Sequence, residues 1–495
     1  FVMLNHAKKH AKPYVLIFFS TKDKLSYCDI IFNNCSGKPM NLDSKHFDIN
    51  SANFLEEFAK FISFPSISAD SDHLQDCENC AHFLVDHVNK IFDVELWETP
   101  GHPPIIYASY KSEDPLSPTL MLYNHYDVQP AQLSDGWKGD PFILREENGN
   151  LYARGASDNK GQCFYTLKAL QHYYESQGNF PLNIIWLIEG EEESGSLALF
   201  TWLEKKKEAL RADYLLIVDG GFLSEKHPYV SIGARGIVSM KISLEEGNKD
   251  MHSGVLGGIA YNTNRALSEI LSSLHHPDNS IAIEGFYDDL ALPSDSDRPD
   301  LPKSDTLREC EENLGFRPQG YEASYSPEES ALRPTVEING ISGGYTGPGF
   351  KTVIPYRATA YLSCRLVPNQ DPDKAAHQVI HHLKQQVPSS LKFSYEILPG
   401  GSRGWRSSAN LPIVKVLQEI YSDLYNEECL RLVMPATIPI GPLLGEAAQT
   451  SPIICGTSYL SDDIHAAEEH FSMDQLKKGF LSICQLLDKL PKIKE

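Results

Sequence analysis

The feature that most constrains this chain is a set of four apolar, strand-like segments, each running directly into a turn that carries His, Asp or Glu. These turns lie at residues 124–127, 157–161, 189–195 and 218–220. Ligands of an open α/β sheet collect outside the carboxyl ends of its strands, so the polar side chains are expected at one edge of one sheet. Carboxylates and imidazoles gathered there repel one another unless a positive group lies among them. Bound metal is the simplest candidate.

Length and charge narrow the class of protein. With 495 residues the chain is too long for one ordinary hydrophobic core, and two domains are expected. A formal net charge of -22, from 44 basic and 66 acidic side chains, argues against nucleic acid or an anionic membrane as a partner. The charge does not identify a cationic substrate, because most of it is expected on solvated surface. No transmembrane span is predicted.

The ten cysteines are scattered along the chain, which is typical of reduced thiols in a cytoplasmic protein. Cys77 and Cys80 form a lone C-x-x-C pair, which could be a redox motif or half of a zinc site. No second pair stands at zinc-finger spacing, and the surrounding pattern is that of an amphipathic helix. We therefore predict two ordinary helix cysteines.

Strand-like and helix-like segments alternate in the first half of the chain. A helix is predicted to begin at a cap near Ser51, and another covers residues 161–174. Patterns of buried strands cover residues 119–123, 182–188 and 214–218. This alternation predicts a mostly parallel sheet with helices on both faces.

The pattern changes from about residue 232. The expected strands lie at 238–244, 335–339 and 352–367, and the expected helices at 262–274 and 371–387. Strand, helix, strand, strand, helix is typical of a small α+β sandwich. A helical pattern is predicted again near Leu411, short strands around Ile438 and Ile453, and a final helix from Met473.

The simplest architecture is one α/β domain interrupted by a smaller α+β domain. The first comprises residues 47–231 and 404–495, and the second comprises residues 232–403. Residues 1–46 are predicted to be a poorly ordered or peripheral extension.

Two of the acidic turns suggest specific chemistry. His125 would face a metal while Asp127 holds the other imidazole nitrogen and fixes its tautomer. By itself, such a pair is more often an ordinary turn. Asp158 precedes a helix and could simply cap it, or it could be a carboxylate that bridges two cations.

The remaining candidates are ambiguous one by one. Acidic runs such as 191–193 are mostly solvated, but this run follows a buried strand, where one carboxylate could bind metal while its neighbour acts as a general base. Asp219 could be an ordinary strand-end residue, and His252 and His465 ordinary loop histidines. The joint pattern of strand-end acids with flanking histidines favours a metal site.

Long motifs in this chain resemble one known family. They are the segments 125–130, 158–162, 189–195, 250–258 and 351–355. The chain resembles the acetylornithine deacetylase, aminoacylase and carnosinase family of dinuclear metallopeptidases, most closely its dipeptidase branch. The match runs in order over roughly residues 50 to 490. The resemblance implies that residues 232–403 form a lid and dimerisation domain.

The resemblance implies a role for each candidate. Asp158 would bridge two metal ions, with Glu193 and His465 completing one site and His125 and Asp219 the other. Glu192 would be the general base that takes a proton from the attacking water and passes it to the leaving amine.

The resemblance also implies a shared active site and a way of holding substrate. His252 and Thr352 would reach the active site of the neighbouring subunit in a homodimer. Arg365 would grip the substrate carboxylate with its bidentate guanidinium. Thr437 would also contact the substrate. Ordinary strand and loop positions are the alternative for Arg365, Thr352 and Thr437.

This chain departs from the dipeptidase relatives near the expected substrate. Their Arg-Glu-Gly-Gly-Ser-Ile-Pro segment corresponds to residues 433–439 here, and their His-Gly-Gly corresponds to residues 399–401, which begin with Pro399. Asn159 replaces a common second Asp. These departures leave the ligand and base set intact but question the recognition of a terminal carboxylate.

The function predicted from the sequence is metal-dependent hydrolysis of dipeptides or small peptides by a cytoplasmic enzyme with two metal ions. Zinc is expected, and manganese or cobalt would also suit these ligands. The nearest alternative is an N-acyl-amino-acid deacylase or desuccinylase. Others are a non-catalytic binding homologue and a structural metal protein with closed coordination.

Overall fold

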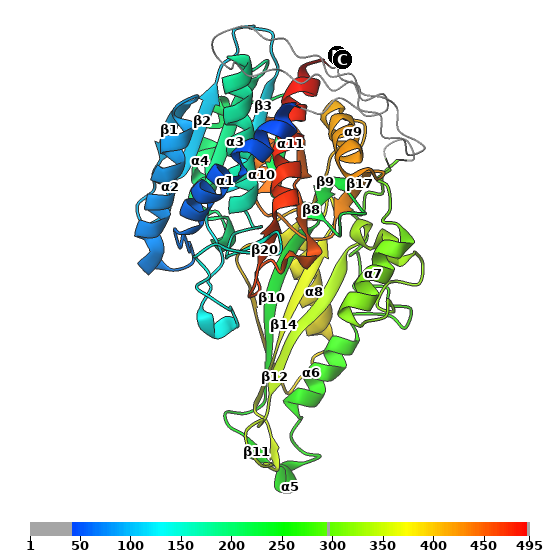
Figure 1. Ribbon diagram of the computed structural model, residues 1–495. Coiled ribbons are helices and arrows are strands. Elements are labelled where there is room, and N and C mark those ends of the chain that lie inside the picture. Colours follow the sequence, from blue (N-terminus) through cyan, green and yellow to red (C-terminus); the bar gives the residue numbers. More distant parts are fainter. Residues whose placement is uncertain (1–41, 295–297, 493–495) are drawn as a thin grey trace, which may run out of the picture. The chain divides into compact units, whose positions relative to one another are not determined.

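The computed structural model describes residues 42–294 and 298–492 (Figure 1). Three of the four acidic turns follow strands of its largest sheet. In spatial order the strands of this sheet are β1 (Asp93–Trp97), β2 (Ile105–Tyr110), β6 (Asn183–Glu189), β3 (Thr119–His125), β7 (Tyr214–Val218), β18 (Pro452–Cys455), β9 (Tyr229–Ala234) and β16 (Trp405–Arg406), and β17 (Leu430–Met434) also pairs with β9. The pairs β6–β3, β3–β7 and β7–β18 are parallel. The outer pairs β1–β2, β2–β6 and β9–β16 are antiparallel. The predicted mixed, mostly parallel sheet is confirmed.

Both faces of this sheet are covered because successive side chains of a strand point to opposite faces. On β3, Leu120 and Leu122 belong to one hydrophobic cluster, whereas Met121 and Tyr123 belong to another. The first cluster includes residues of α1 (Leu42–Ile62), α2 (Leu74–Val88), α3 (Lys160–Gln177), α9 (Pro412–Tyr425) and α11 (Met473–Lys489). The second includes residues of α4 (Leu197–Lys205) and α10 (Gly441–Ala448). A strand buried on both sides must be apolar throughout, as these strands are.

Short strands fix the loops around the carboxyl edge of this sheet. β4 (Arg145–Glu147), β5 (Asn150–Tyr152) and β20 (His470–Ser472) form one small sheet. β8 (Gly221–Phe222) and β19 (Ser458–Tyr459) pair in parallel. These two pairings tie the C-terminal segment of the chain to the loops that follow β7 and precede α3.

The inserted domain has its own core and a second sheet. Its strands, in spatial order, are β12 (Thr335–Gly343), β14 (Arg357–Leu366), β10 (Gly236–Glu245) and β15 (Lys392–Ile397). The even-numbered residues of β10 pack with α6 (Thr263–Ser272) and α8 (Pro372–Gln386) in a separate hydrophobic cluster. The other face of the sheet carries polar residues such as Lys241 and Glu337. The domain boundaries at 231/232 and 403/404 stay a prediction, and β9 of the large sheet runs on to Ala234, past the first of them.

A two-stranded ribbon extends beyond the end of this second sheet (Figure 1). It pairs β11 (Met251–His252) with β13 (Val353–Ile354), and α5 (Ser253–Leu256) follows directly. Between α6 and β12 the chain forms α7 (Ser304–Leu314) and the 3-10 helix η6 (Pro327–Leu332). The ribbon therefore sets His252 beside the segment that contains Thr352.

Several predicted elements differ from the structure. The strand expected over 352–367 is two strands, β13 and β14, because Pro355 interrupts the pairing. The strand expected around Ile438 is wrong: Ile438 lies in the turn before α10, whose second residue is a proline. The edge strand β15, whose residues are mostly exposed or half-buried, was not predicted.

The first helix also begins earlier than predicted. α1 starts at Leu42, and Ser51 lies inside it, where its hydroxyl donates to the carbonyl of Asp48 instead of capping an N-terminus. Residues 42–46 of the predicted extension are therefore helical, and residues 1–41 lie outside the described residues. Cys77 and Cys80 are buried, free thiols on α2, as expected for ordinary helix cysteines.

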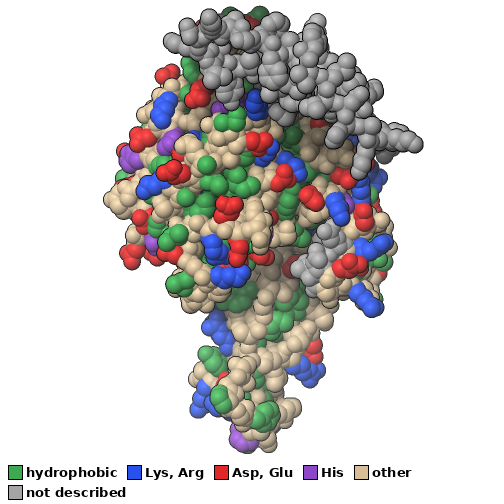
Figure 2. Space-filling model, in the orientation of Figure 1, with side chains coloured by type: hydrophobic (Ala, Val, Ile, Leu, Met, Phe, Trp, Pro, Cys, Tyr) green, Lys and Arg blue, Asp and Glu red, His purple; other side chains and the backbone are tan. Residues whose placement is uncertain are grey.

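On the face of the molecule shown in Figure 2, acidic side chains are interspersed with basic ones. This is the pattern expected of charge spread over solvated surface. Within the described ranges, no helix combines the length and the hydropathy needed to cross a membrane.

Packing of α1 on the sheet predicts a large cost for Phe58→Ala. The ring of Phe58 is fully buried, and its centroid lies 5.1 Å from that of Phe164 on α3. Removing such a ring is expected to lower the free energy of unfolding by about 3–5 kcal/mol, measured by urea denaturation. Ile49→Ala, at a position on the same helix that is 70% exposed, is the control and should change it by less than about 0.5 kcal/mol. Equal effects would contradict the packing of α1.

Candidate metal centre

Parallel strands bring the acidic turns to one edge of the large sheet. His125 ends β3 and stands in register with Glu189 at the end of β6. Asp219 follows Val218, the last residue of β7, on the other side of β3. Asp158 lies just before α3, and Glu192 and Glu193 lie in the 3-10 turn after β6. The strands β3, β6 and β7 therefore deliver three of the four acidic turns at their carboxyl ends. The strand expected directly before 157–161 is wrong: a loop after β5, a strand of the small sheet, carries Asp158 to the start of α3.

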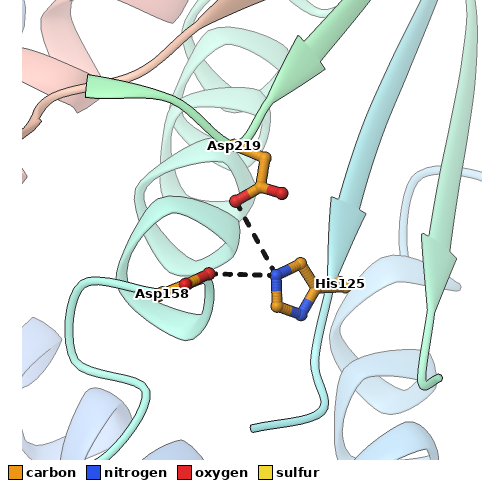
Figure 3. A group of neighbouring side chains, drawn as sticks. All are labelled: His125, Asp158 and Asp219. Atoms are coloured by element: carbon orange, nitrogen blue, oxygen red, sulfur yellow. Dashed lines mark hydrogen bonds and ion pairs between the residues drawn. The ribbon is translucent and has the colours of Figure 1, made fainter. Parts of the chain in front are cut away.

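Two overlapping groups of side chains could each hold a metal ion. The first is His125, Asp158 and Asp219, and the second is Asp158, Glu193 and His465. In each group the candidate ligand atoms all lie within 4.8 Å of one another. In the first group, His125 Nε2 lies 3.1 Å from Asp158 Oδ1 and 3.7 Å from Asp219 Oδ1 (Figure 3).

The second group uses the other oxygen of the same aspartate. His465 Nε2 lies 3.0 Å from Asp158 Oδ2 and 3.3 Å from Glu193 Oε1. The Asp158 carboxylate thus presents one oxygen to each group, which is the geometry that a carboxylate bridging two cations requires.

The charges of this cluster depend on one another. Hydrogen bonds to Asp158 and Glu193 raise the pKa of His465 to about 10. Burial lowers the pKa of His125, but Asp219, Asp127 and Asp158 outweigh it and raise the pKa well above its ordinary value. Burial raises the pKa of Asp158, but hydrogen bonds from the two imidazoles outweigh it and hold the pKa well below its ordinary value. The acids therefore stabilise positive charge among them.

The donor set fits divalent cations. Imidazole nitrogen and carboxylate oxygen are ligands that zinc, manganese and cobalt accept. Glu193 Oε1 is buried, and the neighbour described for it is the His465 ring at 3.3 Å, so it is an acceptor that a cation could satisfy more fully. Its other oxygen, Oε2, accepts a hydrogen bond of 2.8 Å from the Gln129 amide, which orients the carboxylate.

Asp127 holds both halves of the cluster. Its Oδ1 lies 3.3 Å from Nδ1 of His125, the ring nitrogen that faces away from Asp158. The same carboxylate accepts the peptide N–H groups of Glu192 and Glu193, at 3.1 and 3.0 Å. The hydroxyl of Ser68 donates to its Oδ2 at 2.6 Å. Asp127 therefore orients the His125 ring and fixes the turn that carries the two glutamates.

Glu192 stands next to Glu193 in this turn but belongs to neither ligand group. Burial raises the pKa of Glu192 well above its ordinary value, opposed by the charge of His125 and reinforced by Asp219. A carboxylate beside the ligands but outside them is placed to accept a proton rather than a metal ion.

The residues expected to bind substrate fall into two places. Arg365, near the end of β14, donates from Nη1 to Thr437 Oγ1 at 2.7 Å, so these two are brought together. His252 and Thr352 are brought together on the ribbon, where the Ser253 N–H donates to the Thr352 carbonyl at 2.9 Å. The exposed His252 ring accepts from the Gly254 N–H and lies in neither ligand group.

Several residues that support the cluster were not singled out from the sequence. The buried Glu469 carboxylate accepts the N–H groups of Gly155, Ser157 and Asp158 at 2.9–3.0 Å, and the Arg154 guanidinium at 2.6 Å. Glu469 therefore fixes the loop that presents Asp158. Its position in the acidic segment after His465 could have drawn attention to it. The neighbouring sequence, however, gives no sign that its partners are peptide N–H groups about 310 residues earlier in the chain.

The side-chain amide of Asn159 forms hydrogen bonds that an ionised aspartate could not form. Its Nδ2 donates to Asp219 Oδ1 at 2.8 Å, and its Oδ1 accepts from the Asn124 amide at 2.8 Å. An aspartate in its ordinary ionised form could not donate to Asp219. The departure from the common Asp thus supplies a hydrogen bond to a candidate ligand.

Known proteins share both the sequence and the fold. The chain is 28% identical over 474 residues to a Cys-Gly metallodipeptidase of Schizosaccharomyces pombe, covering 92% of this chain and 99% of the relative. It is 31% identical over 401 residues to the human Beta-Ala-His dipeptidase, covering 78% of each. The solved structure of the di-peptidase Dug1p from Saccharomyces cerevisiae has a TM-score of 0.75 and 25% identity, covering 92% of this chain and 98% of that chain.

The family description "Peptidase family M20/M25/M40" matches residues 121–489, which include every residue of the two candidate ligand groups. Because this match spans more than half of the chain and the human relative exceeds 30% identity over most of its length, the chain belongs to peptidase family M20/M25/M40.

Proposed function

We propose that this protein hydrolyses the amide bond of dipeptides or similar small peptides with two divalent metal ions. The observation that carries the proposal is the Asp158 carboxylate, which presents one oxygen to each of two ligand groups beside the unligated Glu192. The names of the relatives, a Cys-Gly metallodipeptidase and a Beta-Ala-His dipeptidase, support this substrate class. A structural metal site would not need a free acid beside closed coordination.

His125 and Asp219 would hold one ion, and Glu193 and His465 the other, with Asp158 between them. Zinc is the proposed metal, and manganese and cobalt also suit the ligands. Bound there, the ions would neutralise the acidic cluster, polarise the scissile carbonyl and lower the pKa of the attacking water.

The chain's own residues would move the proton and hold the substrate. Glu192 takes the proton of the attacking water on its carboxylate and passes it to the leaving amine. Asp127 keeps the His125 tautomer fixed through Nδ1. Arg365, whose Nη1 is oriented by Thr437, offers its guanidinium to the substrate carboxylate.

We also propose a cytoplasmic homodimer. His252 and Thr352 share the ribbon that extends beyond the second sheet, which suits two side chains that reach the neighbouring active site together. His252 would donate to the oxyanion there. Cys77, Cys80, Cys163, Cys364, Cys429, Cys455 and Cys484 are free and buried, as expected of a protein in a reducing compartment.

Two alternatives to a dipeptidase are another metal-dependent amide hydrolase and a homologue without catalytic activity. An N-acyl-amino-acid deacylase would prefer acylated amino acids, and a non-catalytic homologue would turn over neither class. A hydrolysis screen of dipeptides against N-acyl amino acids, with zinc, manganese or cobalt restored to the metal-free protein, separates the three. We expect dipeptide hydrolysis that requires added metal.

Glu192→Ala tests the general base. Loss of a positioned base is expected to lower kcat by roughly 10²–10⁴-fold, while the metal content measured by mass spectrometry stays that of the wild type because Glu192 lies in neither ligand group. Glu208→Ala, at a side chain that is 86% exposed, is the matched control. Near wild-type hydrolysis by Glu192→Ala would disprove the assigned mechanism.

Metal removal tests the cluster without an activity assay. Chelation should lower the melting temperature, because the acids then repel without a cation and a ligand of the native state no longer stabilises it. Added zinc should restore the melting temperature of the wild type but much less that of Asp158→Asn, which loses the shared carboxylate. A melting temperature insensitive to chelator would argue against a metal site.

A shared active site is tested by mixing two inactive variants. His252→Ala and Glu192→Ala homodimers should each be inactive, whereas a mixed dimer regains one intact site from the two different subunits. Random mixing should then recover about a quarter of wild-type activity. Recovery in the mixture, measured against each variant alone, would support the crossed arrangement. No recovery from mixtures whose subunit exchange is verified would contradict it.

A further inference from the structure

Arg235 occupies the point where the chain passes from one sheet to the other. It follows β9 of the large sheet and precedes β10 of the inserted domain. The hydrogen bonds of its peptide N–H and its guanidinium go to main-chain carbonyls in two loops.

The first of these loops is the segment in which the chain departs from the dipeptidase relatives. The Arg235 N–H donates to the carbonyls of Met434 and Ala436, at 3.3 and 3.1 Å. Its Nε donates to the Pro435 carbonyl at 2.8 Å. Pro435 and Ala436 are exposed, so no burial of their side chains fixes this loop. Arg235 therefore sets the conformation of the segment directly before Thr437.

Thr437 in turn orients the guanidinium proposed to bind substrate. Its hydroxyl accepts from Arg365 Nη1 at 2.7 Å. The second loop held by Arg235 is the end of η6, where Nη1 lies 3.4 Å from the carbonyls of Ser330 and Arg333. This loop leads into β12, whose Thr335 stands in register with Arg365. Both loops that border Arg365 are thus tied to Arg235.

The positive charges of the two guanidiniums repel each other, and the charge of Glu337 offsets part of this repulsion. Burial, followed by the charge of Arg365, lowers the pKa of Arg235 to about 10, and the charge of Glu337 opposes this fall. Among the described residues, neither guanidinium forms an ion pair with an acidic side chain. Carbonyl oxygens satisfy N–H groups without neutralising their charge. A bound carboxylate would relieve the repulsion between the two arginines.

We propose that Arg235 is a positioning residue for a carboxylate-binding site: it holds residues 434–436 so that Thr437 orients Arg365, and its charge adds to that of Arg365. The site thereby selects peptides with a free C-terminal carboxylate, although the family's glycine-rich segment is absent. This inference rests on the proposed function and extends it to the substrate class. The alternative is that Arg235 only braces the passage between the two sheets.

The test compares Arg235→Gln and Arg235→Lys with the wild type, using the dipeptide Ala-Gly and its C-terminal amide. In Arg235→Gln, KM for the free acid should rise at least tenfold with kcat within about threefold, while KM for the amide stays unchanged. Arg235→Lys keeps the charge but loses the fork of donors, so its KM should lie between the two. If the amide turns over too slowly, its inhibition constant against the acid substrate replaces KM.

Lys241→Gln is the matched control. Lys241 is another cation of the inserted domain's sheet, lies over the ring of Tyr361 at 5.8 Å, and has no part in the loops around Thr437. It should leave the preference for acid over amide intact. Hydrogen exchange of the peptide N–H groups of Met434, Ala436 and Thr437 should quicken in Arg235→Gln but not in Lys241→Gln, a readout that needs no turnover.

The possible failures are distinct. If wild-type protein with restored metal hydrolyses no dipeptide, the proposed function and this assignment both fall. If it does, and Arg235→Gln keeps the preference for the free acid or loses kcat equally on both substrates, Arg235 is only a structural brace. If Arg235→Gln does not fold, an Arg235→Lys variant with the wild-type preference and wild-type KM overturns the assignment alone.

Discussion

The structure depends on the placing of several negative charges against the carboxyl edge of an apolar sheet. Asp158, Glu193 and Asp219 could not lie this close without positive charge among them. His125 and His465 supply part of it, each within 3.1 Å of an Asp158 oxygen. A pair of divalent cations would supply it more completely. The loops around the carboxyl edge of the sheet hold these charged side chains close together.

Two further acids, Asp127 and Glu469, fix loops that carry candidate ligands. Asp127 and Glu469 each use a carboxylate to accept peptide N–H groups, Asp127 from the turn of Glu192 and Glu193, and Glu469 from the loop of Asp158. Hydrogen bonds between a carboxylate and N–H groups are about twice as strong as neutral ones. The loops that carry Asp158 and Glu193 thus have their main chain fixed by hydrogen bonds to these two carboxylates. The acids of this chain thus include, besides the candidate ligands, carboxylates whose partners are main-chain N–H groups.

The sequence predicted those parts of the fold that have a strong local pattern. β7 was found with its correct bounds, because a strand buried on both faces is apolar throughout. The start of α1 was misplaced, because the polar residues before Ser51 hide a helix and Ser51 resembles a cap. The strand expected around Ile438 does not form, because Pro439 and the proline at the start of α10 disfavour strand pairing there. At the candidate site, residue types at strand ends were informative. Nothing in the amino-acid pattern marks Glu469 or Arg235, because most of their hydrogen-bond partners are main-chain atoms.

The order of strands in the large sheet has a consequence for the synthesis of the protein. β18 lies between β7 and β9, yet it is made only after the whole inserted domain, and His465 follows it. A chain still growing on the ribosome therefore has a gap in the middle of its main sheet and lacks one candidate ligand. The inserted domain has a separate core and can form first. The large sheet closes only when the C-terminal segment arrives, so a truncated chain would lack both a complete core and a complete metal centre.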